Sequence, residues 1–292
     1  MHSRSQQRDE TDPPEDGESK IEPAGAEASE QFRKRCKMPS PGIISTDRKL
    51  EVRLAENQLE IEKALALRFE VFNLEMNEGL EESLATGKDR DEYDLYCDHL
   101  IVLDRTKDDK IVGTYRLLRG SIARANIGFY SENEFNLAAL DNLPGEVAEI
   151  GRSCVHKDYR DGSVISMLWI GLGNYMNQFN VRYLSGCASL HTTDPQDASE
   201  MYACMKAKDM MAEEKYHVEP LESHKLEGFN ANLEIQDVKA TYKKMPALLK
   251  GYVRAGSRFC SEPAIDREFG TIDFYIIFDK TEVDKRYGRH YL

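Results

Sequence analysis

Six short stretches of the chain have the pattern of β-strands, either because apolar and polar residues alternate, as in 49–54 and 271–278, or because they are short runs with the character of a strand. The stretches are residues 49–54, 100–103, 110–118, 147–155, 182–188 and 271–278. The polar turn 104–109 joins the second stretch to the third, so we expect these two strands to form an antiparallel hairpin.

Between and after these stretches, apolar residues recur every three or four positions, which predicts helices. The segments with this spacing are 59–74, 163–179, 196–214 and 238–258. Asn57 is expected to cap the first of them, and Pro246 is expected to kink or restart the last. The order of the elements predicts an α/β (α+β) fold in which helices cover a mixed central sheet.

Two arginines lie at positions where the pattern places apolar side chains. Arg68 shares a helical stripe with Ile61 and Leu65, and Arg116 shares a strand face with Leu118. A buried guanidinium is strongly disfavoured unless a carboxylate meets it. We therefore expect one paired network that either shapes a site or only holds the fold, with five members: Arg68, Asp91, Asp94, Arg116 and Arg152.

The first part of the chain differs in composition from the rest. Residues 1–41 are rich in Glu, Asp, Ser, Gln and Pro and contain almost no large apolar side chains. Such a segment cannot bury enough apolar surface to offset the entropy of ordering, so it is expected to be disordered and dispensable for folding and turnover. Residues 42–292 are expected to form a single domain.

Charge, hydropathy and cysteine usage exclude several classes of protein. The formal net charge of −13 argues against a nucleic-acid-binding protein, which would need Lys and Arg to neutralise phosphates. Neither a signal sequence nor an apolar run of membrane-spanning length is visible. The six cysteines include no CxxC pair, so we expect neither a metal site nor a disulfide framework. A cytoplasmic protein, at most peripheral to the inner membrane, is the resulting expectation.

Several short motifs resemble known acyltransferases when they are taken in order. Arg68 with Phe72, Asp91-Glu92-Tyr93-Asp94, Arg116-Leu117-Leu118 and Glu149-Ile150-Gly151-Arg152 resemble the charged signature of acyl-homoserine-lactone synthases. A closer resemblance, to the ornithine-lipid Nα-acyltransferases (also labelled haemolysin-like), lies in Gly151–His156, Gly186–Ser189, Thr193–Pro195, Leu248–Tyr252 and Phe269–Phe274. The resemblance runs from about Lys49 to Leu292.

This resemblance implies a fold like that of the GNAT N-acetyltransferases. It also implies a (3-hydroxy)fatty acyl group carried on acyl carrier protein as the donor and the α-amino group of L-ornithine as the acceptor. The product would be the N-acyl amino acid of the first step of ornithine lipid biosynthesis. One departure disfavours a lactone product: homoserine-lactone synthases carry a tryptophan soon after the Arg-xxx-Phe helix, whereas the single tryptophan here is Trp169.

Acyl transfer to an amine requires a base, a positioned thioester and a donor for the oxyanion, but no covalent nucleophile. Glu149 is the candidate base, acting directly or through a water, because its strand is expected at the centre of the sheet. A bulge near Gly151 would bring Arg152 to the same side, and we predict both to be catalytic. The alternative is that Glu149 is only the salt-bridge partner of a buried arginine. Substrate binding is assigned to Arg68, Asp91, Asp94, Arg116 and Ser153.

The turn before the helix at 163–179 lies where other GNAT enzymes present a glycine-rich loop to the pyrophosphate of coenzyme A. Ser163 and Ile165 are bulkier than such a loop requires, whereas a single phosphate could dock there. Arg160, Gly162 and Ser163 are therefore the predicted phosphopantetheine-binding residues. The phosphopantetheine thioester is a co-substrate, and no resident cofactor is expected.

An acidic carrier protein needs a basic patch on its acidic partner. Arg119 and Arg124 form one candidate patch. The other candidate lies along the segment predicted as a late helix and comprises Lys239, Lys243, Lys244, Lys250, Arg254 and Arg258.

Three alternatives remain open at this point. The chain could use another acceptor, as an N-acyl amino acid or acyl-homoserine-lactone synthase does. It could take its acyl group from a coenzyme A thioester. It could also be a non-catalytic module that binds a carrier protein, in which case Glu149 would lie far from any cleft.

Overall fold

The computed structural model describes residues 43–44, 49–79 and 81–282. The chain separates into two units, Met1–Met38 and Pro39–Leu292, and every described residue belongs to the second. The tail expected at residues 1–41 therefore lies outside the described residues.

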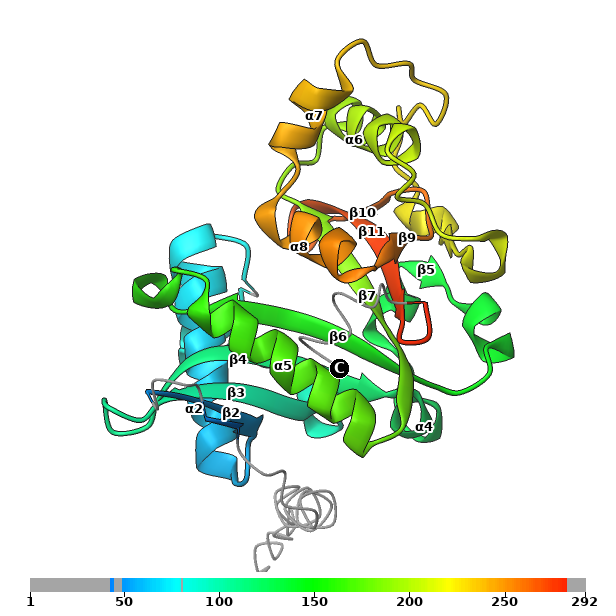
Figure 1. The fold of residues 1–292 in the computed structure, drawn as a ribbon. Helices are drawn as coiled ribbons and strands as arrows, with labels where there is room; N and C mark the ends of the chain where they lie inside the picture. The colour runs from blue at the N-terminus through cyan, green and yellow to red at the C-terminus, as the bar shows by residue number, and fades with distance from the viewer. Residues whose placement is uncertain (1–42, 45–48, 80, 283–292) are drawn as a thin grey trace, which may run out of the picture. The chain divides into compact units, whose positions relative to one another are not determined.

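Nine strands of the described residues form one sheet, in the order β1-β2-β3-β4-β6-β7-β11-β10, with β9 paired to β11 (Figure 1). The strands are β1 (Ile43–Ile44), β2 (Leu50–Leu54), β3 (Asp98–Asp104), β4 (Lys110–Arg119), β6 (Glu146–Val155), β7 (Val181–Leu190), β9 (Arg258–Phe259), β10 (Ala264–Asp266) and β11 (Thr271–Asp279). The short strands β5 (Phe135–Asn136) and β8 (Glu219–Pro220) form a separate pair. The six predicted strands are all present, and the 104–109 turn joins an antiparallel hairpin.

Helices cover both faces of this sheet, as predicted. The α-helices are α2 (Gln58–Phe69), α3 (Ser83–Thr86), α4 (Gly120–Ala125), α5 (Ser163–Gln178), α6 (Pro195–Ala207), α7 (Val238–Lys244) and α8 (Ala247–Ala255). The shorter turns are the π-helical η1 (Glu70–Met76) and the 3-10 turns η2 (Glu92–Leu95), η3 (Tyr130–Asn133), η4 (Ala138–Asn142), η5 (Lys157–Tyr159), η6 (Glu214–Tyr216) and η7 (Glu222–His224). Helix α5 packs on one face of β2, β3 and β4, and α2 packs on the other face of β4 and β6 (Figure 1).

Pro246 restarts the helix expected at 238–258, as predicted, because it cannot continue α7 and stands at the N-cap of α8. Three predicted boundaries were wrong. This last helix ends at Ala255, and Arg258 lies in β9. The helix expected at 196–214 ends at Ala207, before Asp209 with its left-handed φ of 53°. The helix expected at 59–74 is α2 followed by η1, with Asn57 capping it by accepting a hydrogen bond from Glu60.

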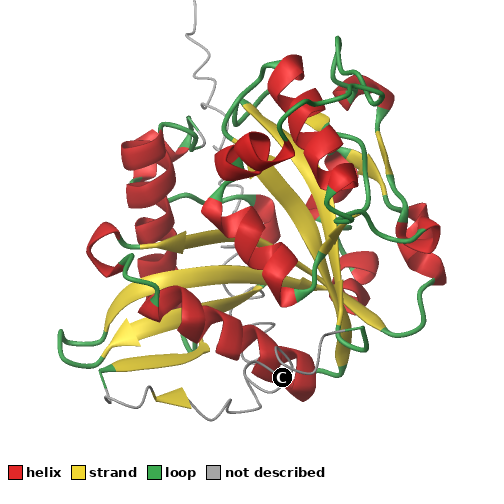
Figure 2. Cartoon of the chain, turned by 45° about the horizontal axis from the view of Figure 1, so that its top comes forward, coloured by secondary structure: helices red, strands yellow, loops and turns green. Residues whose placement is uncertain are grey.

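The sheet divides where β6 and β7 cease to pair. They are parallel and pair from Glu146 to Glu149 and from Val181 to Ser185, whereas the other pairs of labelled strands among the described residues are antiparallel. At the next residue Gly186 has a φ of 156°, and a Cβ there would lie 2.4 Å from the carbonyl oxygen of Ile150. Beyond this point β6 remains paired with β4 and β7 with β11, so the two halves of the sheet diverge (Figure 2).

Within the described residues, no helix combines the length and the apolar character needed to cross a membrane.

Candidate active site

A cavity of about 480 Å³ opens between the diverging halves of the sheet. The residues that line it come from both sides of the division and from α8. They include Arg116, Tyr130, Glu149, Arg152, Ser153, Cys187, Ser189, Tyr252, Asp266 and Asp273. Several buried charged residues therefore meet one internal space.

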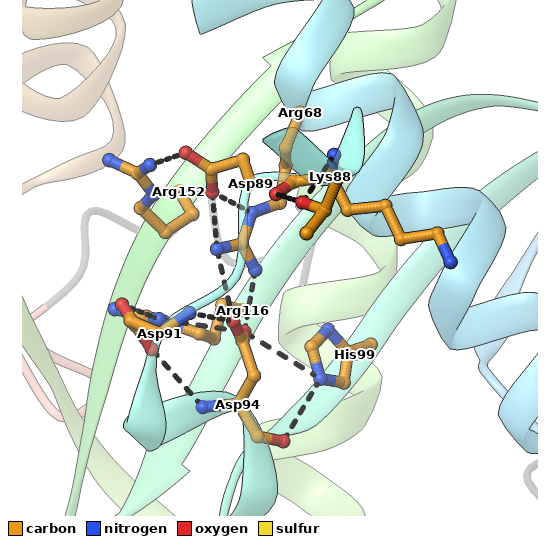
Figure 3. Close-up of polar contacts among 9 residues, drawn as sticks. Arg68, Lys88, Asp89, Asp91, Asp94, His99, Arg116 and Arg152 are labelled. Atoms are coloured by element: carbon orange, nitrogen blue, oxygen red, sulfur yellow. Dashed lines mark hydrogen bonds and ion pairs between the residues drawn. The ribbon is translucent and has the colours of Figure 1, made fainter. Parts of the chain in front are cut away.

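One wall of the cavity is held by a network of arginines and aspartates (Figure 3). Arg68, on α2, is only 1% exposed and donates to two carboxylates: to Asp89 from Nε at 2.7 Å and to Asp94 from Nη1 at 2.6 Å. Arg152 donates to the other side of Asp89, and Arg116 donates to Asp91. The predicted network is thus present.

Asp94 is the centre of this network and also shapes the backbone. It accepts hydrogen bonds from Arg68 and from the backbone N–H of Asp91, while Asp91 accepts one from the N–H of Asp94, so the pair forms a capping box at η2. Burial alone would raise the pKa of Asp94, but the charges of Arg68 and Arg116 hold it well below its usual range. Asp94 is therefore ionised at neutral pH.

The aspartate that joins Arg68 to Arg152, Asp89, was not singled out from the sequence. Its side chain is fully buried, and it contacts the two arginines through both carboxylate oxygens. The available signal was its position two residues before Asp91, in the same acidic run. With Asp89 included, three arginines face three aspartates, so the network is balanced in charge.

Arg152 reaches the network because β6 is bulged, as expected near Gly151. The register between β4 and β6 shifts between Thr114 and Arg116, and Arg152 takes a left-handed φ of 51°. Its guanidinium lies between the rings of Phe72 and Phe269, with its centre 4.7 and 4.8 Å from their centroids. The bulge thus aims Arg152 into the cavity wall instead of the opposite face of the sheet.

Glu149 lines the cavity but is not held by an arginine. Its carboxylate accepts backbone hydrogen bonds from Tyr130 at 2.7 Å and Ser131 at 2.9 Å, at the start of η3. Among the described residues it forms no ion pair, so the reading of Glu149 as the partner of a buried arginine was wrong. Burial raises its pKa, although the hydrogen bonds from Ser131 and Tyr130 oppose this.

Two tyrosines and a serine form another polar group on the cavity wall, with Tyr115 on β4, Ser153 on β6 and Tyr252 on α8. The hydroxyl groups of Tyr115 and Tyr252 are hydrogen-bonded to each other, and Ser153 also bonds to Tyr115. Burial raises the pKa of Tyr115 to about 12, so it is a proton donor at neutral pH. Ser153 was a predicted site residue, whereas the tyrosines were missed because tyrosines in predicted core elements give no distinct signal.

A second group of acids was also missed: Asp266 and Asp273 line the cavity, and Glu134 lies behind the lining residue Cys187, which contacts its Oε1 at 3.6 Å. Asp266 and Asp273 come from the β10–β11 hairpin, and Glu134 follows η3. Glu134, Cys187 and Asp273 have side-chain ligand atoms all within 4.8 Å of one another. This grouping could not be predicted, because the three residues lie in segments far apart along the chain.

The predicted donor-binding turn lies at the mouth of the cavity. Arg160 lines it, donates to the carbonyl oxygen of Val155 and pairs with Glu75 at 2.6 Å. Gly162 is the N-cap of α5, with a φ of 97°. Ser163 donates from both N and Oγ to Asp161, whose carboxylate therefore stands at the helix start.

The two candidate basic patches differ in position. Arg119 is paired with Asp98 and lies over the ring of Phe179, at the C-terminal end of α5, far from Gly162 at its start. The other residues do not share one helix as expected: Lys239, Lys243 and Lys244 belong to α7, Lys250 and Arg254 to α8, and Arg258 to β9. Helix α8, which carries Lys250 and Arg254, lines the cavity through Leu248, Leu249 and Tyr252.

Comparison with known proteins agrees with this fold. Residues 67–170 match the family described as an acetyltransferase (GNAT) domain. Among solved structures, a coenzyme A-dependent acyl-homoserine lactone synthase is similar, with 15% identity, 80% of each chain covered and a TM-score of 0.47. The GNAT match and the division of the sheet between β6 and β7 define the chain as a GNAT-fold acyltransferase.

Two curated relatives narrow this class. The chain is 34% identical over 266 residues to an L-ornithine N(alpha)-acyltransferase of Agrobacterium fabrum, with 89% of this chain and 90% of the relative covered. It is also 34% identical over 252 residues to the L-ornithine N(alpha)-acyltransferase of Brucella abortus, with 83% and 88% covered. The chain belongs to the L-ornithine Nα-acyltransferase family.

Proposed function

We propose that this acyltransferase moves a (3-hydroxy)fatty acyl group from acyl carrier protein to the α-amino group of L-ornithine, the first step in making an ornithine lipid. Family membership supports the acceptor. The observation that carries the proposal is the cavity at the division of the sheet, in which Glu149 of β6 faces the same space as the Tyr115–Tyr252 pair. In this proposal Glu149 is the base and the tyrosine pair is the proton donor at one reaction centre.

Glu149 takes a proton from the α-ammonium group in this mechanism. Glu149 accepts hydrogen bonds from two backbone N–H groups, which fix the position of its carboxylate. A carboxylate can accept about four hydrogen bonds, so acceptor positions remain for the amine. A raised pKa brings the base closer to the pKa of the amine, which favours proton transfer near neutral pH.

The deprotonated amine then attacks the thioester carbonyl. A C–N bond forms, the negative charge moves to the carbonyl oxygen, and the C–S bond breaks as the oxygen returns to a carbonyl. The amide nitrogen loses a second proton, and the thiolate gains one to leave as the thiol of the carrier. Tyr115 and Tyr252 are the proposed donors to the developing charge, and Ser153 orients Tyr115.

The acyl chain has an apolar surface beside this centre. The cavity is lined there by Val71, Phe72 and Met76 of η1 and by Leu248 and Leu249 of α8. Met76 and Leu248 are 37% and 36% exposed, which makes the mouth apolar. We propose that the chain leaves through this mouth towards the surface of the inner membrane, where the amphiphilic product is released.

Acyl carrier protein is the proposed donor because of the start of α5. The backbone N–H of Ser163 donates a hydrogen bond to the Asp161 carboxylate and is therefore not free to bind a phosphate. The carboxylate also adds negative charge where a pyrophosphate would bind. Arg160 is exposed beside it and suits a single phosphate. The basic side chains of α7 and α8 are the proposed docking surface for the acidic carrier.

The proposal is tested by expressing the chain in a bacterial host that lacks aminolipids and analysing its lipids by mass spectrometry. Cells that make the wild-type protein are expected to accumulate Nα-acylornithine, and cells that make Glu149→Gln are expected to accumulate little. An N-acyl derivative of another amino acid, with none of ornithine, would overturn the acceptor. A lipid profile identical to that of the empty host would overturn the proposed function.

A further inference from the structure

One group of buried acids is not used in the mechanism above. Asp273 of β11 is paired with Ser189 of β7. Two residues further along each strand, on the same face of the sheet, Tyr275 is paired with Cys187. Glu134 comes from the segment that covers this face, and Cys187 contacts its Oε1 at 3.6 Å. Asp266 lies on the neighbouring strand β10. Asp266, Asp273 and Cys187 all line the cavity.

No arginine or lysine of the described residues forms an ion pair with these acids, although the charge of Arg152 acts on Asp266 and that of His191 on Asp273 from further away. Among the described residues, none of the ion pairs involves Glu134, Asp266 or Asp273. Glu134 is 3% exposed, and its Oε2 has no hydrogen-bond partner in the part of the chain that the structure describes. This contrasts with the balanced arginine–aspartate network on the other side of the cavity, in which every carboxylate meets a guanidinium.

Such an arrangement lowers the stability of the folded enzyme when no ligand is bound. Burial, and then the charges of Asp273 and Asp266, raise the pKa of Glu134 to about 9. Burial also raises the pKa of Asp273 to about 6, against a hydrogen bond from Ser189. Groups that face the cluster from the neighbouring elements include Tyr130 and Glu149, which carry no positive charge. Arg152 acts on Asp266, and His191 opposes the rise in the pKa of Asp273, but neither forms an ion pair with the cluster among the described residues. A bound cation would remove the repulsion.

We propose that Glu134, Asp266 and Asp273 form a subsite that binds the side-chain ammonium group of the acceptor amino acid. This inference rests on the proposed function and adds the basis of acceptor choice. The cavity runs from Glu149 on β6 to Asp266 and Asp273 on the β10–β11 hairpin, so one diamino acid faces a base at its α-amino end and the acid cluster at its other end.

The subsite also accounts for the choice between the two amines of the acceptor. An ammonium held among carboxylates has a raised pKa and stays protonated, so it is not a nucleophile. The amine at Glu149 can lose its proton and react. Acylation at the α-position and not at the side chain follows from this difference.

The test compares L-ornithine with L-norvaline, which has the same carbon chain without the terminal amine. A site built around a substrate N–H group rejects the analogue that lacks it, so wild-type kcat/KM should favour ornithine by at least about 1,000-fold. In the double variant Glu134→Gln, Asp273→Asn this preference should fall by about 100-fold or more. Asp104→Asn, which changes a buried acid of β3 outside the cavity, should keep the wild-type preference.

A second readout needs no turnover. Without any donor, L-ornithine should raise the melting temperature of the wild type more than L-norvaline does, and the double variant should lose this difference. Glu134→Gln alone should fold and melt at or above the wild-type temperature at pH 8, because it removes a buried repulsion. This separates loss of the subsite from loss of the fold.

The outcomes distinguish the two proposals. If the wild type acylates ornithine and the double variant keeps the full preference over norvaline, the subsite is refuted and the proposed function stands. If zinc chloride binds stoichiometrically to the wild type but not to the double variant, and chelation abolishes activity, the cluster is a metal site instead. If neither amino acid is acylated, the proposed function fails, and the ornithine-dependent melting shift still decides whether the cation subsite exists.

Discussion

The buried charged residues around the cavity fall into two kinds with opposite effects on stability. Arg68, Arg116 and Arg152 meet Asp89, Asp91 and Asp94 in a balanced network. Glu134 and Asp273 face each other without a cation among the described residues. The first arrangement is stable in the free protein, whereas the second becomes favourable only when a positively charged ligand arrives.

Replacement of Asp94 by Asn should destabilise the protein by about 3 kcal/mol at neutral pH, because Arg68 and Arg116 then remain buried with one carboxylate fewer. The folded-state pKa of Asp94 is lowered, so its contribution is present above the unfolded pKa of about 4 and is lost as pH falls through the folded pKa. Urea unfolding of both proteins at pH 7 and at pH 3 measures this. An equal loss at both pH values would show that the ion pairs contribute little.

Replacement of Glu149 by Gln should lower turnover about 100-fold at neutral pH, as for loss of a general base. The deficit should shrink as pH rises, because more of the α-amine is then already neutral. The measurement is kcat against pH for both proteins.

Glu132→Gln is the matched control, since Glu132 accepts a hydrogen bond from Phe129 at the same turn but is exposed and does not line the cavity. If both variants lose activity equally at all pH values, Glu149 only holds the η3 turn.

At the scale of single residues, the sequence identified the network but not its geometry. An arginine on an apolar stripe requires a carboxylate, which is why Arg68 and Arg116 could be matched with Asp94. The hydrogen bonds of Glu149 could not be foreseen, because they come from a turn with no repeating pattern. Glu134 and Asp273 looked like ordinary acids in the sequence, since only the fold brings them together.

At the scale of elements, the parting of β6 from β7 creates the site. Gly186→Ala would place a Cβ 2.4 Å from the backbone oxygen of Ile150, and the φ of 156° is itself unfavourable for alanine. We expect a loss of about 2 kcal/mol or more in the free energy of unfolding, together with lower turnover.

Gly151→Ala is the control for stability, because a Cβ there meets nothing within 4 Å and its φ is not positive. Thermal melts of the two variants check this prediction. Similar melting temperatures for both would mean that the strands part for another reason.

The elements themselves were largely predictable. Short alternating or apolar runs located every strand of four or more residues among the described ones, because a sheet buried on one face imposes a period of two and a strand buried on both faces, such as β3, is a continuous apolar run. The errors lie at the ends of elements, as after α6, where Asp209 takes a left-handed φ, whereas the restart of the last helix at Pro246 was predicted. The short helices between residues 120 and 142 were expected only as an irregular stretch, since segments of four to six residues carry too few turns to show a period.

At the scale of the whole molecule, the net charge of −13 opposes an acidic carrier, so docking depends on local basic groups. With acyl carrier protein as donor, kcat/KM should exceed that with the matching coenzyme A thioester. It should fall as ionic strength rises from about 0.05 to about 0.5 M, because salt screens the attraction. Steady-state rates with both donors across this range test the prediction.

Charge reversal then locates the docking surface. Lys243→Glu with Lys244→Glu, both exposed on α7, should lower kcat/KM for the carrier-bound donor at low salt and leave kcat nearly unchanged. Arg119→Glu with Arg124→Glu is the comparison, because these residues lie at the far end of α5. A larger loss in the second variant would place the carrier at that end instead.

The most direct test of the whole account uses the purified protein with a 3-hydroxyacyl thioester of acyl carrier protein and L-ornithine. The product is identified by fragmentation in the mass spectrometer, which assigns the acyl group to one of the two nitrogens. The account predicts Nα-acylornithine and free carrier thiol in equal amounts, both strongly reduced in Glu149→Gln. Absence of any acylornithine, or acylation at the side-chain nitrogen instead, would contradict it.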